Sequence, residues 1–438
     1  MYDLISKFNN NLNLKNIPII LIGLIPATLV AGPLVSEIFL FVIFFFFLFF
    51  YFIKQKKIFI NKNILLGFLV FCLYLIFTSL SAIEKEVSFK SSFFYFRHGI
   101  YLVAIYYFLV TSKDSIKISY VLLKITIIFI LFDSIFQILF DKNTFGFVVD
   151  QNSKRFSGPF HDKYILGSFL QKIIPLFIYL SLKNSHFHKI NKFDLLILIV
   201  SLGIIYRSGD RSSLGLIFLY GGIFFVVNRS LREKVFIVFI SFLLFSTILT
   251  VQNPKSLDRT LYDTIDQLKG KHFEKQLKRG LNTTNFDILI FSYHHQSHFL
   301  TAFRMFKDSP IIGHGVKMFR YKCDKYKTTI QASKDIKNLK NYGCTTHPHN
   351  TYVQLLSETG IIGFMVIFII FINTFIRILR NFKVRKDYVI SNNALLIGIF
   401  INLWPIIPTG NFFNNWISII YFLPIAYYFF DNFKKNKT

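Results

Sequence analysis

The residues best suited to chemistry are one histidine and two arginines beside apolar segments. His349 belongs to the stretch Cys344-Thr-Thr-His-Pro-His-Asn-Thr-Tyr, where a polar loop turns into an apolar helix with no break between them. Asn350 or Thr351 can cap the start of that helix. An imidazole at this boundary between water and lipid can titrate near neutral pH and still reach a lipid-borne substrate. We therefore expect His349 to act as a general base.

The two arginines lie in short polar loops rich in small residues. Arg155 sits in Lys-Arg-Phe-Ser-Gly-Pro-Phe, and Arg211 sits in Ser-Gly-Asp-Arg-Ser-Ser. Small residues let a backbone approach a ligand closely, helix N-termini favour anions, and guanidinium groups bind phosphate through paired hydrogen bonds. Either arginine alone could be an interfacial anchor, and Arg211 could simply pair with Asp210. Together with His349, the pair favours a diphosphate clamp.

Two further residues could support this clamp from nearby. Arg97 lies near the start of another apolar segment, at the same predicted outer side of the membrane as Arg155 and Arg211. It either extends the clamp or snorkels to the membrane surface. His314 lies between two glycines in a tight turn, which suggests a supporting position beside the reacting groups.

The expected helix after His349 offers two more candidates. His347 is separated from His349 by Pro348, so the two side chains can point in different directions. Glu358 lies about two and a half helical turns beyond His349. A carboxylate at that depth is either an intramembrane partner or a capping and packing group.

Metal binding and disulfide formation need separate consideration. His294, His295 and His298 resemble a metal site, but no carboxylate or thiol lies nearby at ligand spacing, so we predict no metal. Cys323 and Cys344 flank a loop rich in Lys and Asn. On an oxidising outer side they would form a disulfide, stabilising the loop by about 3 kcal/mol and anchoring the chain that leads to His349. The alternative is two free thiols.

The elements that must position these residues are apolar helices. Hydrophobic residues make up 53% of the 438 positions, and 57 residues are Phe. Repeated apolar runs of about 20 residues predict an all-α, polytopic membrane protein and exclude a soluble domain. We expect twelve spans, at residues 17–32, 34–53, 64–82, 93–110, 116–140, 164–182, 193–206, 212–227, 235–251, 352–376, 389–407 and 416–430.

The charges predict how these spans are oriented. The chain has 50 Lys and Arg against 23 Asp and Glu, a net charge of +27, and most of the basic excess falls in alternate short loops. Anionic lipid head groups and membrane topology explain this excess better than nucleic acid does. The basic loops, and with them both termini, are then cytoplasmic. No cleavable signal peptide is evident, because the first apolar run continues into a second one without a cleavage site.

The spans divide the chain into three predicted parts. Residues 1–251 form the first nine helices, 252–349 form a large outer segment, and 350–438 form the last three helices. Within the outer segment, Phe299, Phe303 and Phe306 fall at helical spacing. This pattern predicts an amphipathic helix lying against the membrane face.

With these residues in place, the chain resembles the O-antigen ligase and O-antigen polymerase superfamily of bacterial envelopes. The similarity covers the twelve-span layout and most of the chain after Arg155. The motifs on which this resemblance rests are Arg-Phe-Ser-Gly-Pro-Phe at Arg155, Asp-Arg-Ser-Ser at Arg211, Phe306-Lys-Asp-Ser-Pro-Ile-Ile-Gly-His-Gly, and His347-Pro-His-Asn-Thr-Tyr-Val-Gln-Leu-Leu-Ser-Glu-Thr-Gly-Ile-Ile-Gly. Asp210 departs from the pattern, because small residues often precede this arginine.

The resemblance implies a glycosyltransferase of lipopolysaccharide biosynthesis in the bacterial inner membrane. It takes glycan from undecaprenyl diphosphate at the periplasmic face, without a metal or other cofactor. Arg155 and Arg211 hold the diphosphate, and His349 activates the acceptor hydroxyl.

Two alternatives remain open beside the ligase. A ligase moves the glycan to lipid A-core, whereas a polymerase moves it to another lipid-linked repeat unit, and the motifs do not separate the two. A transporter of the same lipid is the third possibility. Transporters tend to place charges at mid-membrane, whereas the charged candidates here lie at the outer ends of spans, which favours an enzyme.

Overall fold

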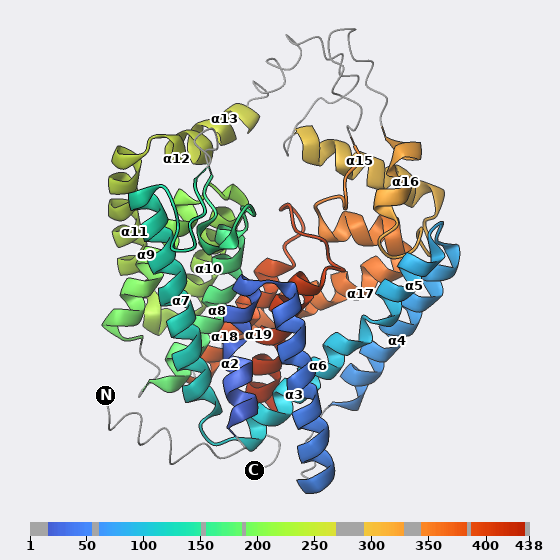
Figure 1. The fold of residues 1–438 in the computed structure, drawn as a ribbon, viewed down its shortest axis with the longest axis horizontal. Coiled ribbons are helices and arrows are strands. Elements are labelled where there is room, and N and C mark those ends of the chain that lie inside the picture. Colours follow the sequence, from blue (N-terminus) through green and yellow to red (C-terminus); the bar gives the residue numbers. More distant parts are fainter. Residues whose placement is uncertain are drawn as a thin grey trace.

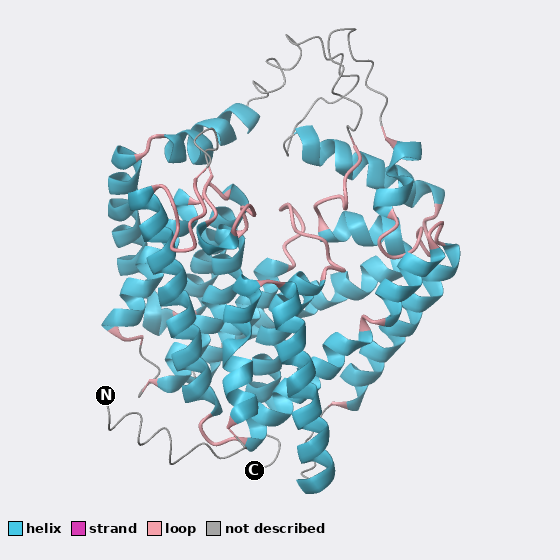
Figure 2. Ribbon diagram, viewed as in Figure 1, coloured by secondary structure: helices cyan, strands magenta, loops and turns pink. Residues whose placement is uncertain are grey.

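The chain folds into a bundle of helices (Figures 1 and 2). The computed structural model describes residues 16–54, 61–149, 155–185, 190–268, 293–327, 343–382 and 387–433. Within these ranges its regular elements are helices, and β pairing is limited to an isolated bridge between Lys142 and Val148. The predicted all-α class is therefore confirmed.

Each apolar segment predicted as a span forms a helix. These helices are α2 (Ile17–Ala31), α3 (Pro33–Lys54), α4 (Lys62–Thr78), α6 (Phe96–Thr111), α7 (Ser115–Phe140), α8 (Leu166–Asn184), α9 (Lys192–Arg207), α10 (Arg211–Val227), α11 (Arg232–Gln252), α17 (Thr351–Phe382), α18 (Asp387–Asn402) and α19 (Asn415–Phe433). By length and composition, seven helices in the described residues can cross a membrane, and three shorter helices are also apolar. The chain is thus a helical membrane protein, while the count of twelve spans and the three-part division stay predictions.

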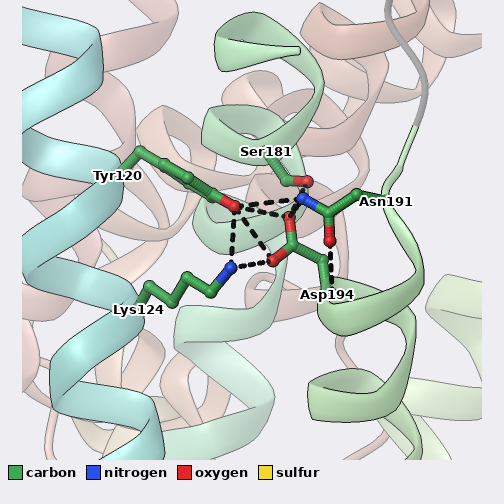
Figure 3. A network of polar contacts seen from close by, with 5 residues as sticks. All are labelled: Tyr120, Lys124, Ser181, Asn191 and Asp194. Carbon is green, nitrogen blue, oxygen red and sulfur yellow. Dashed lines mark hydrogen bonds and ion pairs between the residues drawn. The ribbon is translucent and has the colours of Figure 1, made fainter.

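A buried polar network fixes α7, α8 and α9 to one another (Figure 3). The carboxylate of Asp194 is fully buried and accepts hydrogen bonds from Tyr120 at 2.9 and 2.8 Å, from Lys124 at 2.8 Å and from the hydroxyl of Ser181. Asn191 caps α9 by accepting from the backbone N–H of Asp194 at 2.8 Å. A buried charge is tolerated where it is paired and hydrogen-bonded as fully as this one.

Short helices and loops gather at one end of the bundle, the upper part of Figures 1 and 2. The short helices are α12 (Lys255–Leu257), η5 (Asp258–Tyr262), α13 (Asp263–Leu268), α15 (Tyr293–Asp308) and α16 (Phe319–Tyr326). Helix α5 (Lys85–Phe93) precedes α6, and the single turns η1 (Ser79–Ser81), η2 (Gly158–Phe160) and η4 (Arg229–Leu231) lie between the longer helices.

The predicted amphipathic helix of the outer segment corresponds to α15. Thr301, Ala302 and Met305 are fully buried on its inner side, where α15 packs against α16 and α17. Phe303 faces away from these contacts and is 45% exposed. The helix itself is confirmed, and its contact with a membrane stays a prediction. Residues 269–292 and 328–342 of the outer segment lie outside the described residues.

The predicted span at residues 352–376 lies within α17, but this helix is interrupted at Gly360. Gly360 has φ 63° and ψ −167°, and this divides α17 into residues 351–359 and 361–382. The loop after α15 approaches here: Ile361 N–H donates to the Pro310 carbonyl at 2.8 Å, and Gly315 N–H donates to the Glu358 carbonyl at 2.8 Å. A Cβ at position 360 would collide with the Ile311 carbonyl, so only glycine permits both the backbone turn and this approach.

Candidate functional site

Arg155, Arg211 and His349, which lie far apart in the sequence, line the same cavity of about 1580 Å³. Its lining includes an arginine cluster of Arg155, Arg211 and Arg259, and a histidine side formed by His295, His347 and His349; Arg320 also lines the cavity. It also has an apolar side from α2 and α7 that includes Leu24, Ala27, Val30, Leu122, Ile125 and Phe129. The structure therefore brings together the three side chains that the sequence singles out.

Hydrogen bonds to neutral groups hold Arg155 and Arg211 in place. Arg155, in the loop before η2, donates from Nη2 to the Tyr164 carbonyl at 2.6 Å, and its guanidinium lies 5.1 Å from the centre of the Tyr164 ring. Arg211 is the first residue of α10 and donates from Nη1 to Thr264 Oγ1 at 3.3 Å. These contacts help to fix the direction of each side chain.

Asp210 acts as a helix cap beside this cluster. Its carboxylate accepts from the backbone N–H of Ser213 at 3.3 Å at the start of α10. In the described part of the chain, Arg211 and Asp210 form no ion pair within 4.0 Å. The structure therefore does not support the alternative that Arg211 serves only to pair with Asp210.

Arg259 is the member of the cluster that the sequence analysis missed. It lies in η5, after α11, and donates from Nε to the Gly209 carbonyl at 2.7 Å. Burial lowers the pKa of Arg259, the charges of Arg155 and Arg211 lower it further, and Asp263 and Asp210 partly offset these effects. Three guanidinium groups thus repel one another in a partly buried site, an arrangement that an anion would relieve.

Three histidines line the other side of the cavity, and His298 lies beside them. The rings of His347 and His349 lie 4.1 Å apart between centres, so they do not point in different directions. His295 and His298 come from α15, and their ring centres lie 5.4 and 5.6 Å from that of His349. Among the residues that the structure describes, no group of three or more His, Cys, Asp or Glu is arranged to hold a metal ion.

The backbone at His349 is held in an uncommon conformation. Its φ is +58°, in the left-handed region that side chains other than glycine rarely adopt. Asn350 caps α17, as predicted, by accepting from the backbone N–H groups of Tyr352 and Val353 at 3.0 and 3.1 Å. Thr409 N–H donates to the His349 carbonyl at 2.8 Å. The loop is thereby fixed on both sides of His349, which sets the direction of the imidazole.

His347 and His349 both favour the neutral state. Burial lowers the pKa of His349 from its ordinary value of 6.5. Burial, followed by the neighbouring His349, lowers the pKa of His347 to about 3. A general base must be unprotonated before it reacts, but a group with a pKa near 3 binds a proton too weakly to be an efficient base near pH 7, so these shifts favour His349 over His347.

Arg97 and His314 are not among the residues that line this cavity. Arg97 forms an ion pair with Glu37 at 3.0 Å. His314 is buried, with Nε2 2.9 Å from the Met305 carbonyl and Nδ1 2.8 Å from Lys322 Nζ. Since an ammonium group can only donate, His314 Nδ1 accepts and Nε2 donates. His314 therefore connects α15 to α16.

Glu358 also lies away from the cavity lining, inside the first half of α17. It is fully buried and accepts from the Phe319 backbone N–H at 3.1 Å and from Gln354 Nε2 at 3.0 Å. Gln354 in turn donates to Asn411 Oδ1 at 2.9 Å, and Asn411 lines the cavity. Glu358 thus joins α16 and α17 to the turn beside His349.

The structure joins Cys323 to Cys344 in a disulfide, with their Cα atoms 5.3 Å apart. Cys323 lies in α16, and Cys344 precedes His347 by three positions. The bridge attaches the loop of the two cavity histidines to the outer helices.

Comparison with known proteins supports the resemblance seen in the sequence. A search of curated proteins finds no match. The family model described as O-antigen ligase matches residues 196–368, a range that contains Arg211, Arg259 and His349, with Arg155 preceding it. This part of the chain is therefore similar to O-antigen ligases, which supports the resemblance to the O-antigen ligase and O-antigen polymerase superfamily.

Proposed function

We propose that the protein is an O-antigen ligase, which transfers glycan from undecaprenyl diphosphate to lipid A-core. The observation that carries this proposal is the shared cavity, with the arginine cluster on one side and His349 on the other. We further propose that the protein lies in the inner membrane with both termini in the cytoplasm and the cavity open to the periplasm. The alternating basic loops support this orientation.

The proposed reaction is a direct glycosyl transfer. His349 takes the proton from an acceptor hydroxyl, and the hydroxyl oxygen bonds to the anomeric carbon of the donor glycan. The bond from that carbon to the diphosphate breaks, and its electron pair leaves with the diphosphate. Arg155, Arg211 and Arg259 stabilise the negative charge that grows there. A lipid diphosphate is already a good leaving group, so the step needs no additional acid.

The apolar side of the cavity supports a lipid-linked donor. Leu24 and Ala27 of α2 and Leu122, Ile125 and Phe129 of α7 line the same space as the arginine cluster. An amphiphile with an anionic head and an isoprenoid tail needs cationic and apolar surfaces side by side. Ordinary soluble sugar nucleotides would gain nothing from the apolar side.

The alternative is a polymerase of O-antigen or another surface polysaccharide, since the family match covers both activities. The ligase and the polymerase differ in their acceptor, so the test compares the two acceptors. Purified protein in detergent is given a lipid-linked glycan together with either lipid A-core or a second lipid-linked repeat unit. Product on lipid A-core supports the ligase, and product on the repeat unit alone supports the polymerase.

The role of His349 is tested in the same assay. The His349→Ala variant should insert normally and lose transfer, whereas His347→Ala should keep measurable transfer because the base remains. Wild-type transfer by His349→Ala would remove the mechanism. If the wild type forms no product in detergent but moves the lipid across sealed vesicles, the protein is a transporter instead.

A further inference from the structure

Lys172 is a buried cation that lines the cavity from within the membrane helices. It lies in α8, is 8% exposed, and is followed by the almost wholly buried apolar turns of the same helix. Its Nζ contacts Ser168 Oγ at 2.5 Å and the Ser168 carbonyl at 3.3 Å. No carboxylate in the described residues comes within 4.0 Å of it. A cation in such surroundings calls for an anionic partner.

The direction of this side chain places its ammonium near the arginine cluster. Ser168 lies one turn before Lys172, so Lys172 reaches back toward the start of α8. There α8 meets the turn that leads into Arg211, because a Cβ on Gly167 would lie 2.8 Å from Asp210 Cβ. The charge of Asp210 also acts on Lys172. Lys172 therefore approaches the cluster from the membrane side.

Asp210 is a carboxylate shared by several cations of this cavity. It caps α10 and interacts with Arg211, Arg259 and Lys172. Lys172 and the arginine cluster thus bring several positive charges to one region of the cavity, and an anion with more than one charge suits such a region.

The floor of the cavity around Lys172 is polar as well. Gln171 and Asn402 line it, and Gln171 Nε2 donates to Asn402 Oδ1 at 3.2 Å. Gln171 is fully buried, and its Oε1 has no hydrogen-bond partner among the residues that the structure describes. Buried polar groups in an apolar bundle are seldom left in this state without a ligand or water to satisfy them.

We propose that Lys172 binds the lipid-proximal phosphate of a prenyl diphosphate, while the arginine cluster binds the phosphate next to the glycan. Lys172 would then decide between a diphosphate and a monophosphate carrier, since only the diphosphate reaches both groups. A lysine suits this position because its ammonium acts as a point charge on a long flexible stem. The inference rests on the proposed function for the lipid nature of the ligand.

The test measures lipid retention and does not depend on transfer. Purified protein is equilibrated with equal amounts of undecaprenyl diphosphate and undecaprenyl monophosphate, and native mass spectrometry gives the ratio of the two bound lipids. Lys172→Met removes the charge at similar length, and Lys172→Arg keeps it. Lys113→Met, at an exposed position between α6 and α7, is the matched control.

The expected result is a diphosphate preference that falls about tenfold in Lys172→Met and stays within about threefold of wild type in the other two variants. An unchanged ratio in a Lys172→Met protein that elutes and melts like wild type would overturn the inference, and so would a wild type that retains neither lipid. If the ratio falls as expected but wild type transfers no glycan to any acceptor, the proposed function fails and the lipid site stands.

Discussion

Substituting Arg259 tests whether the cluster has three working members or two. The Arg259→Gln variant loses a charged donor while the Arg155 and Arg211 contacts described above remain possible. A hydrogen bond to a charged group contributes about 1.5–3 kcal/mol. At 1.4 kcal/mol per tenfold change, the donor should bind roughly 10- to 150-fold more weakly. Loss of the 2.7 Å bond from the charged Arg259 side chain to the Gly209 carbonyl lowers stability by about 1.5–3 kcal/mol, and the relief of repulsion within the cluster partly offsets this.

The assay is steady-state transfer in detergent, with donor and acceptor concentrations varied separately. We expect KM for the donor to rise or kcat to fall, with KM for the acceptor unchanged. Arg259→Lys should recover part of the loss, because it keeps the charge but not the planar fork. Arg229→Gln is the control, since Arg229 stacks 5.5 Å from the Phe382 ring and does not line the cavity. A loss confined to the acceptor KM, or equal losses in the two glutamine variants, would refute the reasoning.

Three further predictions concern pH and stability. Transfer should fall on the acid side with a midpoint below 6.5, because burial lowers the pKa of His349 from that ordinary value and its neutral form is the base. A pH–rate profile with an acid midpoint above 6.5 would contradict this. Asp194→Ala should destabilise the protein by about 3–5 kcal/mol, because it leaves Lys124 without its carboxylate. Adding Lys124→Met to the same chain should restore part of the melting temperature. Additive losses from the two substitutions would exclude an energetic coupling between Asp194 and Lys124. Gly360→Ala should lower the melting temperature, because it forces a side chain into a left-handed backbone conformation. Gly67→Ala should not, because a Cβ there meets nothing within 4 Å. Equal melting temperatures for the two variants would show that stability does not require the break in α17.

The sequence predicts the helices well because long apolar runs leave the backbone few alternatives in lipid. It also predicts the Asn350 cap, since the local sequence supplies its own hydrogen-bond acceptor. Arg155, Arg211 and His349 could be paired with one another because each stands at the end of an apolar run in a recognisable motif.

What the sequence could not predict depends on contacts between distant segments. Arg259 stands in a charge-rich stretch that looks solvated, and it reaches Gly209 only because α11 packs against α9 and returns the chain to that turn. The nearest sequence signal was its place shortly after an apolar run. The break at Gly360 is set by a loop some fifty positions earlier in the chain, and a single glycine within an apolar helix does not reveal it.

The left-handed backbone at His349 has a practical consequence for trapping a substrate complex. Asparagine and glycine adopt this conformation more readily than histidine does. His349→Asn and His349→Gly should therefore relieve backbone strain at position 349 and remove the base at the same time. Inactive forms of the protein would then be at least as robust as the active one. Such variants would hold donor and acceptor together unreacted, which makes them the natural choice for imaging both ligands in place.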